Sequence, residues 1–342
     1  MAFFQVISAL LTAVPLSLIQ PLLTPLVAAH AQWSRIHDIP TFGLGTWRSD
    51  GDDAAHAVKY ALELGYTHID AAHIYRNEKQ TGLGIAEAQA DRRYIWVTSK
   101  LWNTDHRPER VEPAIKQSLS DLGLQYLDLY LMHWPVAFIP GGEENELDRE
   151  TSIVDTWRAM EDLVRANLTR YIGVSNFSRR NLNQILEVCQ ICPYAHELEL
   201  HPYLQQEEFV NYHHSMGIKV IAYSPLGNTN SIYRGRHREL GPLLSDPYWQ
   251  EIADSKGASI AQCVLAWGMQ RGTAVIPKSV EKEYIYQNFF SMEIKFNPVE
   301  MWNISVHDKK ARMNNPTRTW GVELFADLDD HTPPLDNKGR EL

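Results

Sequence analysis

The chain has 342 residues, of which 44% are apolar and 22% are charged, so it is long enough for one large domain with a full hydrophobic core. Acidic residues outnumber basic ones by 42 to 32, which gives a formal net charge of -10. Such a surface repels phosphate backbones and the chain has no basic run, so a nucleic acid is not expected as a partner.

The first residues form an unusual segment. Residues 1–29 are almost wholly apolar and carry no charge, and residues 29–31 (Ala-His-Ala) resemble the site at which a secretory signal is cleaved. The segment lacks the positive start of such signals, and Pro15, Pro21 and Pro25 disfavour a membrane-spanning helix. We therefore expect a cytoplasmic protein, with a secreted or membrane-associated protein as the alternatives.

From about residue 42 onward, short apolar or β-branched runs alternate with longer amphipathic stretches. The runs predict strands near Gly43–Gly45 and over Thr67–Ala71, Ile95–Lys100, Leu127–His133, Tyr171–Ser175, Glu197–His201, Lys219–Tyr223 and Ala274–Lys278. The amphipathic stretches predict helices over Asp53–Leu64, Glu78–Gln89, Pro108–Leu122, Ile153–Arg165, Arg179–Val188, Gln206–Ser215 and Ile260–Gln270.

This alternation predicts an α/β fold in which helices cover a parallel sheet. Eight such units within about 240 residues favour a closed (β/α)8 TIM barrel over an open, doubly wound sheet. The doubly wound alternative also lacks its glycine-rich first turn, because Gly43-Leu44-Gly45 and Gly82-Leu83-Gly84 have no third glycine at the right offset. We expect these glycines at places where backbones crowd together. The predicted division is an apolar segment at 1–31, which is a candidate leader, a barrel domain at 32–327 and a polar tail at 328–342.

Ionisable side chains stand where three successive predicted strands end. Asp70 ends one strand and is followed by Tyr75, Lys100 ends the next, and His133 ends the third. Reacting groups of such barrels lie at this rim. A carbonyl oxygen that gains a hydride needs a proton, which a phenol can donate, and an ammonium beside that phenol is expected to lower its pKa. In this interpretation Asp70 orients Lys100, His133 hydrogen-bonds the carbonyl oxygen, and no metal is required.

Each of these four residues taken alone has a simpler explanation. Asp70 and Lys100 suit a structural ion pair, His133 a buried core histidine, and Tyr75 an aromatic at the rim. Their occurrence together at successive strand ends favours the catalytic interpretation.

The three cysteines, Cys189, Cys192 and Cys263, are too few and odd in number for a disulfide framework. Cys189 and Cys192 form a C-x-x-C motif near the end of a predicted helix, whereas redox-active pairs stand at a helix start. We expect two packed or half-exposed thiols.

Several segments between about Gly43 and Asn288 together resemble the aldo-keto reductase superfamily, in its fungal glycerol dehydrogenase and aldose or xylose reductase-like branch. These segments are Gly43–Trp47, Gly65–Ala72 followed by Tyr75–Glu78, Val97–Trp102, Leu127–Pro135, Gly173–Phe177, His201–Tyr203, Ala222–Gly227 and Ile276–Ser279. The resemblance implies a (β/α)8 fold, NADPH-dependent reduction of an aldehyde or ketone that also runs in reverse as an alcohol dehydrogenase, and a monomer.

The resemblance also implies roles for individual residues. Asp70, Tyr75, Lys100 and His133 match the catalytic tetrad of the family. Trp47, His133 and Trp134 are expected to contact the substrate. The expected contacts to the cofactor come from Ser175, Asn176, Glu197, Tyr223, Ser224, Leu226, Lys278, Ser279 and Asn288, with Tyr223 stacked on the nicotinamide and Lys278 beside the 2′-phosphate.

The chain departs from the pattern of the family at four places. Glu197 replaces a glutamine, so its negative charge is expected to face the cofactor ring. Tyr284 replaces an arginine that holds the 2′-phosphate, which leaves NADH as a second candidate cofactor, and Gln287 replaces a glutamate. Residues 1–36 do not resemble the hairpin that usually closes the barrel.

Two other functions stay open on the sequence. One is a non-catalytic, NADP(H)-sensing regulatory subunit, against which the intact tetrad argues. The other is a redox-active, membrane-associated protein that uses the C-x-x-C motif and the apolar leader. Substrate selectivity is expected to come from residues 48–52, 137–150, 228–247 and 297–322, and the sequence does not identify the substrate.

Overall fold

The computed structural model describes residues 36–227 and 240–328. Within them, eight parallel strands form one sheet in the order of the sequence. They are β1 (Leu44–Gly45), β2 (His68–Asp70), β3 (Trp96–Leu101), β4 (Leu127–Met132), β5 (Thr169–Ser175), β6 (Ala195–Glu199), β7 (Lys219–Tyr223) and β9 (Thr273–Val275). Parallel bridges from Phe42 to Val275 and from Gly45 to Lys278 join the first strand to the last. The predicted (β/α)8 barrel is therefore confirmed.

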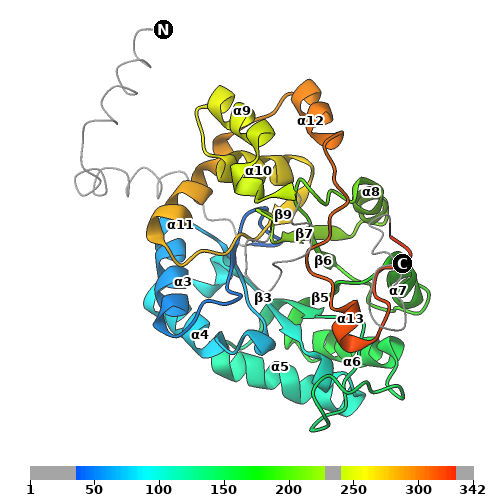
Figure 1. Ribbon diagram of the computed structural model, residues 1–342. Coiled ribbons are helices and arrows are strands. Elements are labelled where there is room, and N and C mark those ends of the chain that lie inside the picture. Colours follow the sequence, from blue (N-terminus) through cyan, green and yellow to red (C-terminus); the bar gives the residue numbers. More distant parts are fainter. Residues whose placement is uncertain (1–35, 228–239, 329–342) are drawn as a thin grey trace.

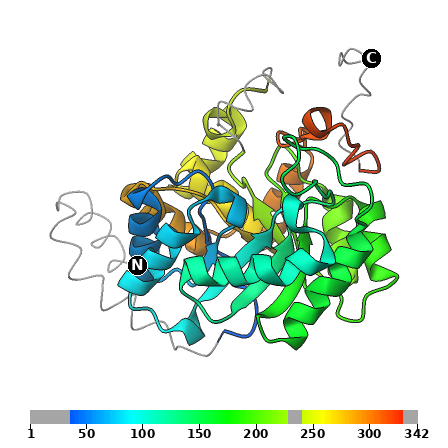
Figure 2. The same ribbon diagram turned by 90° about the horizontal axis from the view of Figure 1, so that it is seen from below.

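Helices surround the barrel, as Figures 1 and 2 show. Those that follow the strands are α3 (Asp52–Leu64), α4 (Glu78–Glu87), α5 (Pro108–Leu122), α6 (Ile153–Arg165), α7 (Arg179–Leu186), α8 (Glu207–Ser215), α10 (Ile260–Gln270) and α11 (Lys282–Phe289). The helices α9 (Pro247–Lys256), α12 (Pro298–Ser305) and α13 (Thr317–Trp320) are additions to the barrel pattern. The sequence interpretation lacks these three and α11.

Local signals place several of these helices. The side chain of Ser152 accepts a hydrogen bond from the third residue of α6, and Ser259 forms a reciprocal capping box with Gln262 at the start of α10. At its other end α5 stops at Gly123, whose backbone is left-handed with φ 66°. These caps explain why the predicted bounds of α5, α6 and α10 agree with the structure to the residue.

The period-two alternation of the strands decides which side chains enter the barrel. In β3 the indole of Trp96 packs with the buried residues inside the barrel at the amino ends of the strands, which we call the lower end. Lys100, four residues further, points the same way at the carboxyl ends of the strands, which we call the upper end. In β2 and β6 the same parity directs Asp70 and Glu197 inward. The lower end is closed by the stacked rings of Tyr171 and Tyr194, with centroids 4.1 Å apart.

The prediction that glycines of the two G-x-G motifs lie where the chain is tightly packed is confirmed at Gly43 and Gly82. A Cβ atom on Gly43 would lie 2.7 Å from Nδ1 of His68, and one on Gly82 would lie 2.5 Å from the carbonyl oxygen of Leu122. Neither position therefore has room for a side chain, which explains both G-x-G motifs without a phosphate-binding turn.

The prediction of two free thiols in the C-x-x-C motif is wrong in this structure. Helix α7 ends at Leu186, before the motif, so Cys189 and Cys192 lie in the following loop with Cα atoms 5.1 Å apart. A disulfide bond joins them, and this separation lies in the range that a disulfide spans. Cys263 is a buried free thiol.

The predictions for residues 1–31 and for residues 329–342 of the polar tail concern residues outside those that the structure describes, as does part of one predicted selectivity loop, at 228–239. Among the residues that the structure describes, none of the helices has the length and apolar character needed to cross a membrane.

Candidate active site

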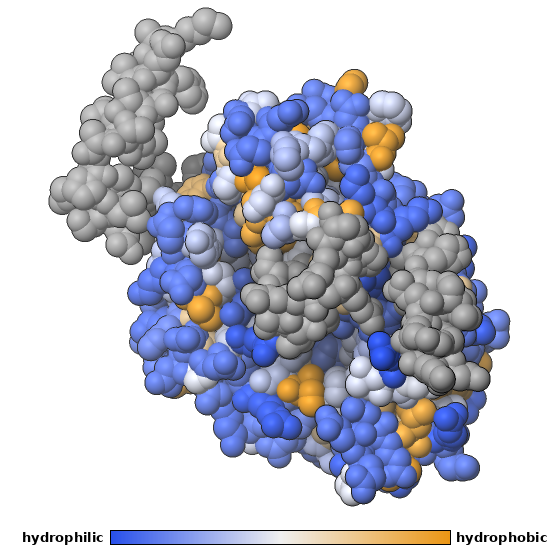
Figure 3. Space-filling view, in the orientation of Figure 1, coloured by the Kyte–Doolittle hydropathy of each residue, from blue (hydrophilic) through white to orange (hydrophobic). Residues whose placement is uncertain are grey.

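A cavity of about 1030 Å³ opens at the carboxyl ends of the strands. Around it the molecular face is mostly hydrophilic, with apolar side chains in small scattered groups (Figure 3). Apart from Lys100, which lies buried behind the wall, all the predicted site residues line this cavity: Trp47, Asp70, Tyr75, His133, Trp134, Ser175, Asn176, Glu197, Tyr223, Ser224, Leu226, Lys278, Ser279 and Asn288. The strand ends thus bring the predicted residues together in one place.

Lys100 joins two carboxyl groups at the deep end of the cavity. Its Nζ lies 2.6 Å from Oδ1 of Asp70 and 3.4 Å from Oε1 of Glu197, and it donates a hydrogen bond to the carbonyl oxygen of Ala71 at 3.0 Å. The three ionisable side chains are 0 to 2% exposed. Burial of the Lys100–Asp70 ion pair is tolerated because its two opposite charges are in contact. The contact with Glu197 was not predicted, since it depends on how the barrel closes.

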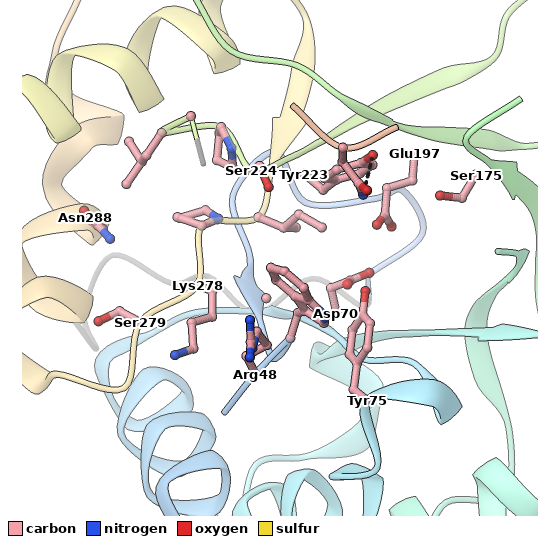
Figure 4. Close-up of a pocket in the computed structure, with 18 of the residues that line it drawn as sticks. Arg48, Asp70, Tyr75, Ser175, Glu197, Tyr223, Ser224, Lys278, Ser279 and Asn288 are labelled. Atoms are coloured by element: carbon pink, nitrogen blue, oxygen red, sulfur yellow. Dashed lines mark hydrogen bonds between the residues drawn. The ribbon is translucent and has the colours of Figure 1, made fainter. Parts of the chain in front are cut away.

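Tyr75 stands beside this group. It ends the short 3₁₀ helix η1 (His73–Tyr75), which follows β2, and Lys100 Nζ lies 5.2 Å from the centre of its ring. Figure 4 shows its hydroxyl directed toward the carboxyl group of Asp70.

The predicted lowering of the pKa of Tyr75 is wrong as a net effect. Burial raises this pKa above the usual value, and the charge of Lys100 and its hydrogen bonding to the phenol only partly oppose the shift. The negative charge of Asp70, and that of Glu197 when it is ionised, raise the pKa further because they disfavour a negative phenolate beside them. The phenol therefore stays protonated at neutral pH and is available as a proton donor.

His133 lies directly after β4 with its ring facing Tyr75. The two ring centres are 5.8 Å apart in an edge-to-face arrangement. Burial lowers the pKa of His133 well below its usual value, and the nearby Lys100 lowers it further, so the imidazole is neutral. The residue lines the cavity and is 7% exposed, whereas its Nδ1 is buried and has no hydrogen-bond partner among the described residues. A neutral imidazole here can donate one hydrogen bond to a ligand oxygen.

A hydrogen-bonded chain lines the same end of the cavity. Asn176, with a left-handed backbone (φ 60°), donates from Nδ2 to the carbonyl oxygen of His133 at 3.0 Å and to Oγ of Ser175 at 2.9 Å. The hydroxyl of Tyr223 donates to Oδ1 of Asn176 at 2.7 Å and accepts from Nδ2 of Asn314 at 3.2 Å. Asn176 and Tyr223 are thus held in fixed orientations.

The opposite end of the cavity carries Lys278, Ser279 and Asn288, with Ser224 between the two ends (Figure 4). Arg48 also lines the cavity, with its Cζ atom 5.6 Å from the ring centre of Trp47. The sequence interpretation assigned Arg48 only to the selectivity loop at residues 48–52. Tyr284, at the position of the missing arginine, lines the cavity and is 59% exposed.

Aromatic side chains form the outer wall near Tyr75. The ring of Trp320, from α13, lies edge-on to Trp134 at 4.9 Å and to Phe138 at 5.3 Å, and Trp102 lies 5.3 Å from the ring of His133. Trp102 and Trp320 were not predicted as pocket residues. Trp102 could have been predicted as a pocket residue, because it directly follows the end of β3. Trp320 could not, because its position at the pocket depends on the path of the chain after α12.

The segment that carries Trp320 is anchored by a buried acid. Glu199, at the end of β6, accepts hydrogen bonds from the backbone N–H groups of Met313 and Asn314 at 2.9 and 2.8 Å and is bonded to His201 at 3.0 Å. Residues 297–322 were predicted to help form the pocket, and Glu199 fixes the backbone of this segment at residues 313 and 314.

The aldo/keto reductase family model matches residues 41–309. An uncharacterized oxidoreductase of Schizosaccharomyces pombe is 44% identical over 85% of this chain and 92% of its own length, and the pig aldo-keto reductase family 1 member A1 is 41% identical over 82% and 90%. Among solved structures, the aldose reductase of Schistosoma japonicum is 37% identical, with a TM-score of 0.78 over 86% of this chain and 97% of that chain. A Bombyx mori aldo-keto reductase in complex with NADP is 34% identical, with a TM-score of 0.78 over 86% and 98%. The predicted fungal branch stays a prediction. The chain belongs to the aldo/keto reductase family and is an oxidoreductase.

Proposed function

We propose that the protein reduces an aldehyde or ketone to an alcohol with NADPH and also runs in reverse, with Tyr75 as the proton donor. The observation that carries this proposal is the convergence of three groups at the deep end of the cavity. A protonated phenol, the buried ammonium of Lys100 and a neutral His133 that lines the cavity lie together there. Hydride addition to a carbonyl carbon requires this combination of a proton donor and a hydrogen-bond donor for the oxygen.

The residues of the cavity fit a dinucleotide cofactor. The cavity volume of about 1030 Å³ exceeds the volume that a small carbonyl compound alone fills. The phenol ring of Tyr223, held by Asn176 and Asn314, offers a flat face for a nicotinamide, and Ser175 and Glu197 lie beside it. At the other end Lys278 and Ser279 suit phosphate groups. Lys278 favours NADPH, which carries the additional 2′-phosphate.

The chain's own residues then account for the proton side of the reaction. The bound reduced nicotinamide supplies the hydride. Tyr75 donates its hydroxyl proton to the carbonyl oxygen, and His133 donates a hydrogen bond to the same oxygen and so fixes its position. Lys100 stabilises the negative charge that remains on Tyr75, and Asp70 keeps Lys100 in place at 2.6 Å.

The aromatic wall indicates the class of substrate. Trp47, Trp134 and Trp320 surround the approach to Tyr75 with indole surface. Burial of an apolar group there gains about 25 cal/mol per Å². We therefore expect aromatic or long-chain aldehydes to be better substrates than free sugars.

The test is to mix purified protein with NADPH and a panel of aromatic, aliphatic and sugar aldehydes and to follow nicotinamide absorbance. The proposal predicts turnover with the aromatic aldehydes. Tight NADPH binding without turnover across the whole panel would contradict it and favour the regulatory alternative.

A further inference from the structure

Glu197 places a second buried carboxyl group at the catalytic end of the cavity. Its Oε1 is 3.4 Å from Lys100 Nζ, while Asp70 Oδ1 is 2.6 Å from the same nitrogen. Asp70 Oδ2 and Glu197 Oε2 find no donor on any third group in the part of the chain that the structure describes, and the two carboxyl groups interact with each other. Two ionised carboxylates beside one ammonium would leave an unpaired negative charge with no water around it, which is costly.

A shared proton removes this excess charge. Lys100 is closer to Asp70, so Asp70 is the ionised member and Glu197 carries the proton. Burial raises the pKa of Glu197 well above its usual value and the charge of Asp70 raises it further, while Lys100 opposes both effects. The charge expected at this position is therefore absent at neutral pH, and protonated Glu197 has the shape of the glutamine that it replaces.

The groups that face Glu197 come from several elements. Asp70 from β2, Tyr75 from η1 and Lys100 from β3 act on it directly. Neutral side chains complete the surroundings at the ends of β4 and β7, His133 and Tyr223. On its own strand, Glu199 is engaged by His201 and the backbone of residues 313 and 314.

We propose that Glu197 selects the redox state of the cofactor through its proton. Glu197 keeps this proton while the uncharged reduced nicotinamide is bound and releases the proton to solvent when the cationic oxidised ring binds. This proposal rests on the proposed function, because it takes NADP(H) as the ligand. It follows from the position of Glu197 in the cavity wall next to Ser175 and Tyr223, the end that suits the nicotinamide (Figure 4). A carboxylate there attracts a pyridinium ring, whereas a carboxylic acid does not.

The consequence is a cofactor preference that depends on pH. Binding of the cation favours loss of the proton from Glu197, so NADP⁺ should bind more tightly as the pH rises, and NADPH should not. Titration of the 2′-phosphate affects both forms of the cofactor alike and cancels from the ratio of their dissociation constants. That ratio therefore reports the charge next to the nicotinamide.

The experiment measures the dissociation constants of NADP⁺ and NADPH by fluorescence titration between about pH 6 and about pH 9 for the wild type, Glu197→Gln and Glu161→Gln. Glu161 is a suitable control, because it is a buried acid on α6 whose Oε1 binds the backbone of Gln190 and Ile191, away from Lys100. We expect the ratio of the NADPH to the NADP⁺ constant to rise about tenfold or more in the wild type and the control. In Glu197→Gln it should change less than about twofold, because Asp70, Tyr75 and Lys100 remain but the titrating acid is gone.

A second measurement does not depend on the variant. Infrared difference spectra of the wild type should show the carbonyl band of a buried carboxylic acid in the free and NADPH-bound protein and its loss on binding NADP⁺. An equal pH dependence in Glu197→Gln and wild type, or a carboxylic acid band unaffected by NADP⁺, overturns the proposal. Failure of both cofactors to bind any of the proteins instead overturns the proposed function on which it rests.

Discussion

Lys100 Nζ lies 2.6 Å from Oδ1 of Asp70, and both side chains are almost completely buried. The ammonium is the positive charge in contact with two carboxyl groups and next to the phenol ring of Tyr75. Its charge therefore matters both for the stability of the barrel and for the chemistry of Tyr75.

Removal of that charge separates the two roles. We predict that Lys100→Met lowers kcat about 100-fold or more, since Tyr75 loses the cation that stabilises its phenolate. The free energy of unfolding should fall by about 3–5 kcal/mol, because a buried carboxylate loses its partner. The double variant Lys100→Met/Asp70→Asn should regain most of the stability but none of the activity. Urea unfolding and steady-state kinetics check this, and recovery of turnover in the double variant would contradict the role of Lys100.

Lys278 should decide between NADPH and NADH. Its side chain stands at the end of the cavity that suits the 2′-phosphate, so Lys278→Met should weaken NADPH binding about 10- to 100-fold and leave NADH binding nearly unchanged. Lys282→Met, on the outer helix α11, is the matched control and should affect neither cofactor. Fluorescence titration with both cofactors measures the effect. Equal weakening of NADPH and NADH would show that Lys278 does not contact the 2′-phosphate.

The wall of the substrate pocket can be tested at Trp320. Trp320→Ala removes edge-to-face contacts with Trp134 and Phe138, so we predict about a tenfold rise in KM for an aromatic aldehyde. The kcat should stay within about threefold of the wild type, because Tyr75 is not touched. Trp302, which is 64% exposed on α12, provides the control Trp302→Ala. A fall in kcat with an unchanged KM would argue against a role of Trp320 in the pocket wall.

His106 makes the stability of the folded state depend on pH. It is buried, neither ring nitrogen has a partner among the described residues, and burial lowers its pKa to about 3. Because the folded state holds the ring neutral, the contribution is present above the unfolded pKa of about 6.5 and is lost as the pH falls from there toward 3. Between pH 7 and pH 5 the wild type should lose about 2 kcal/mol more than His106→Leu in urea unfolding. Parallel curves for the two proteins over this range would refute the assignment.

Much of the fold and the site could be predicted from the sequence. Strand Lys219–Tyr223 and helices such as Pro108–Leu122 were correct to the residue, because their periodicity and caps are local. The strand ends placed Asp70, Lys100 and His133 at one rim, since parallel strands in a barrel share a direction.

The rest depends on contacts between distant parts of the chain. Helix α12 exposes Val299 and Trp302, so it lacks the clear apolar stripe that signals a helix. The position of Trp320 depends on Glu199, which lies more than 100 residues earlier and holds the backbone of 313 and 314. The net rise in the pKa of Tyr75 could not be predicted either, because it results first from the burial of the phenol, which depends on how the barrel and its loops close around it.

The most direct test of the proton donor is the variant Tyr75→Phe, assayed with NADPH and an aromatic aldehyde alongside the control Tyr60→Phe on α3. The account predicts that Tyr75→Phe lowers kcat by about 10²- to 10⁴-fold while NADPH binds within about threefold of the wild-type affinity, because only the hydroxyl is removed. A variant at residue 75 that keeps wild-type turnover would contradict the account.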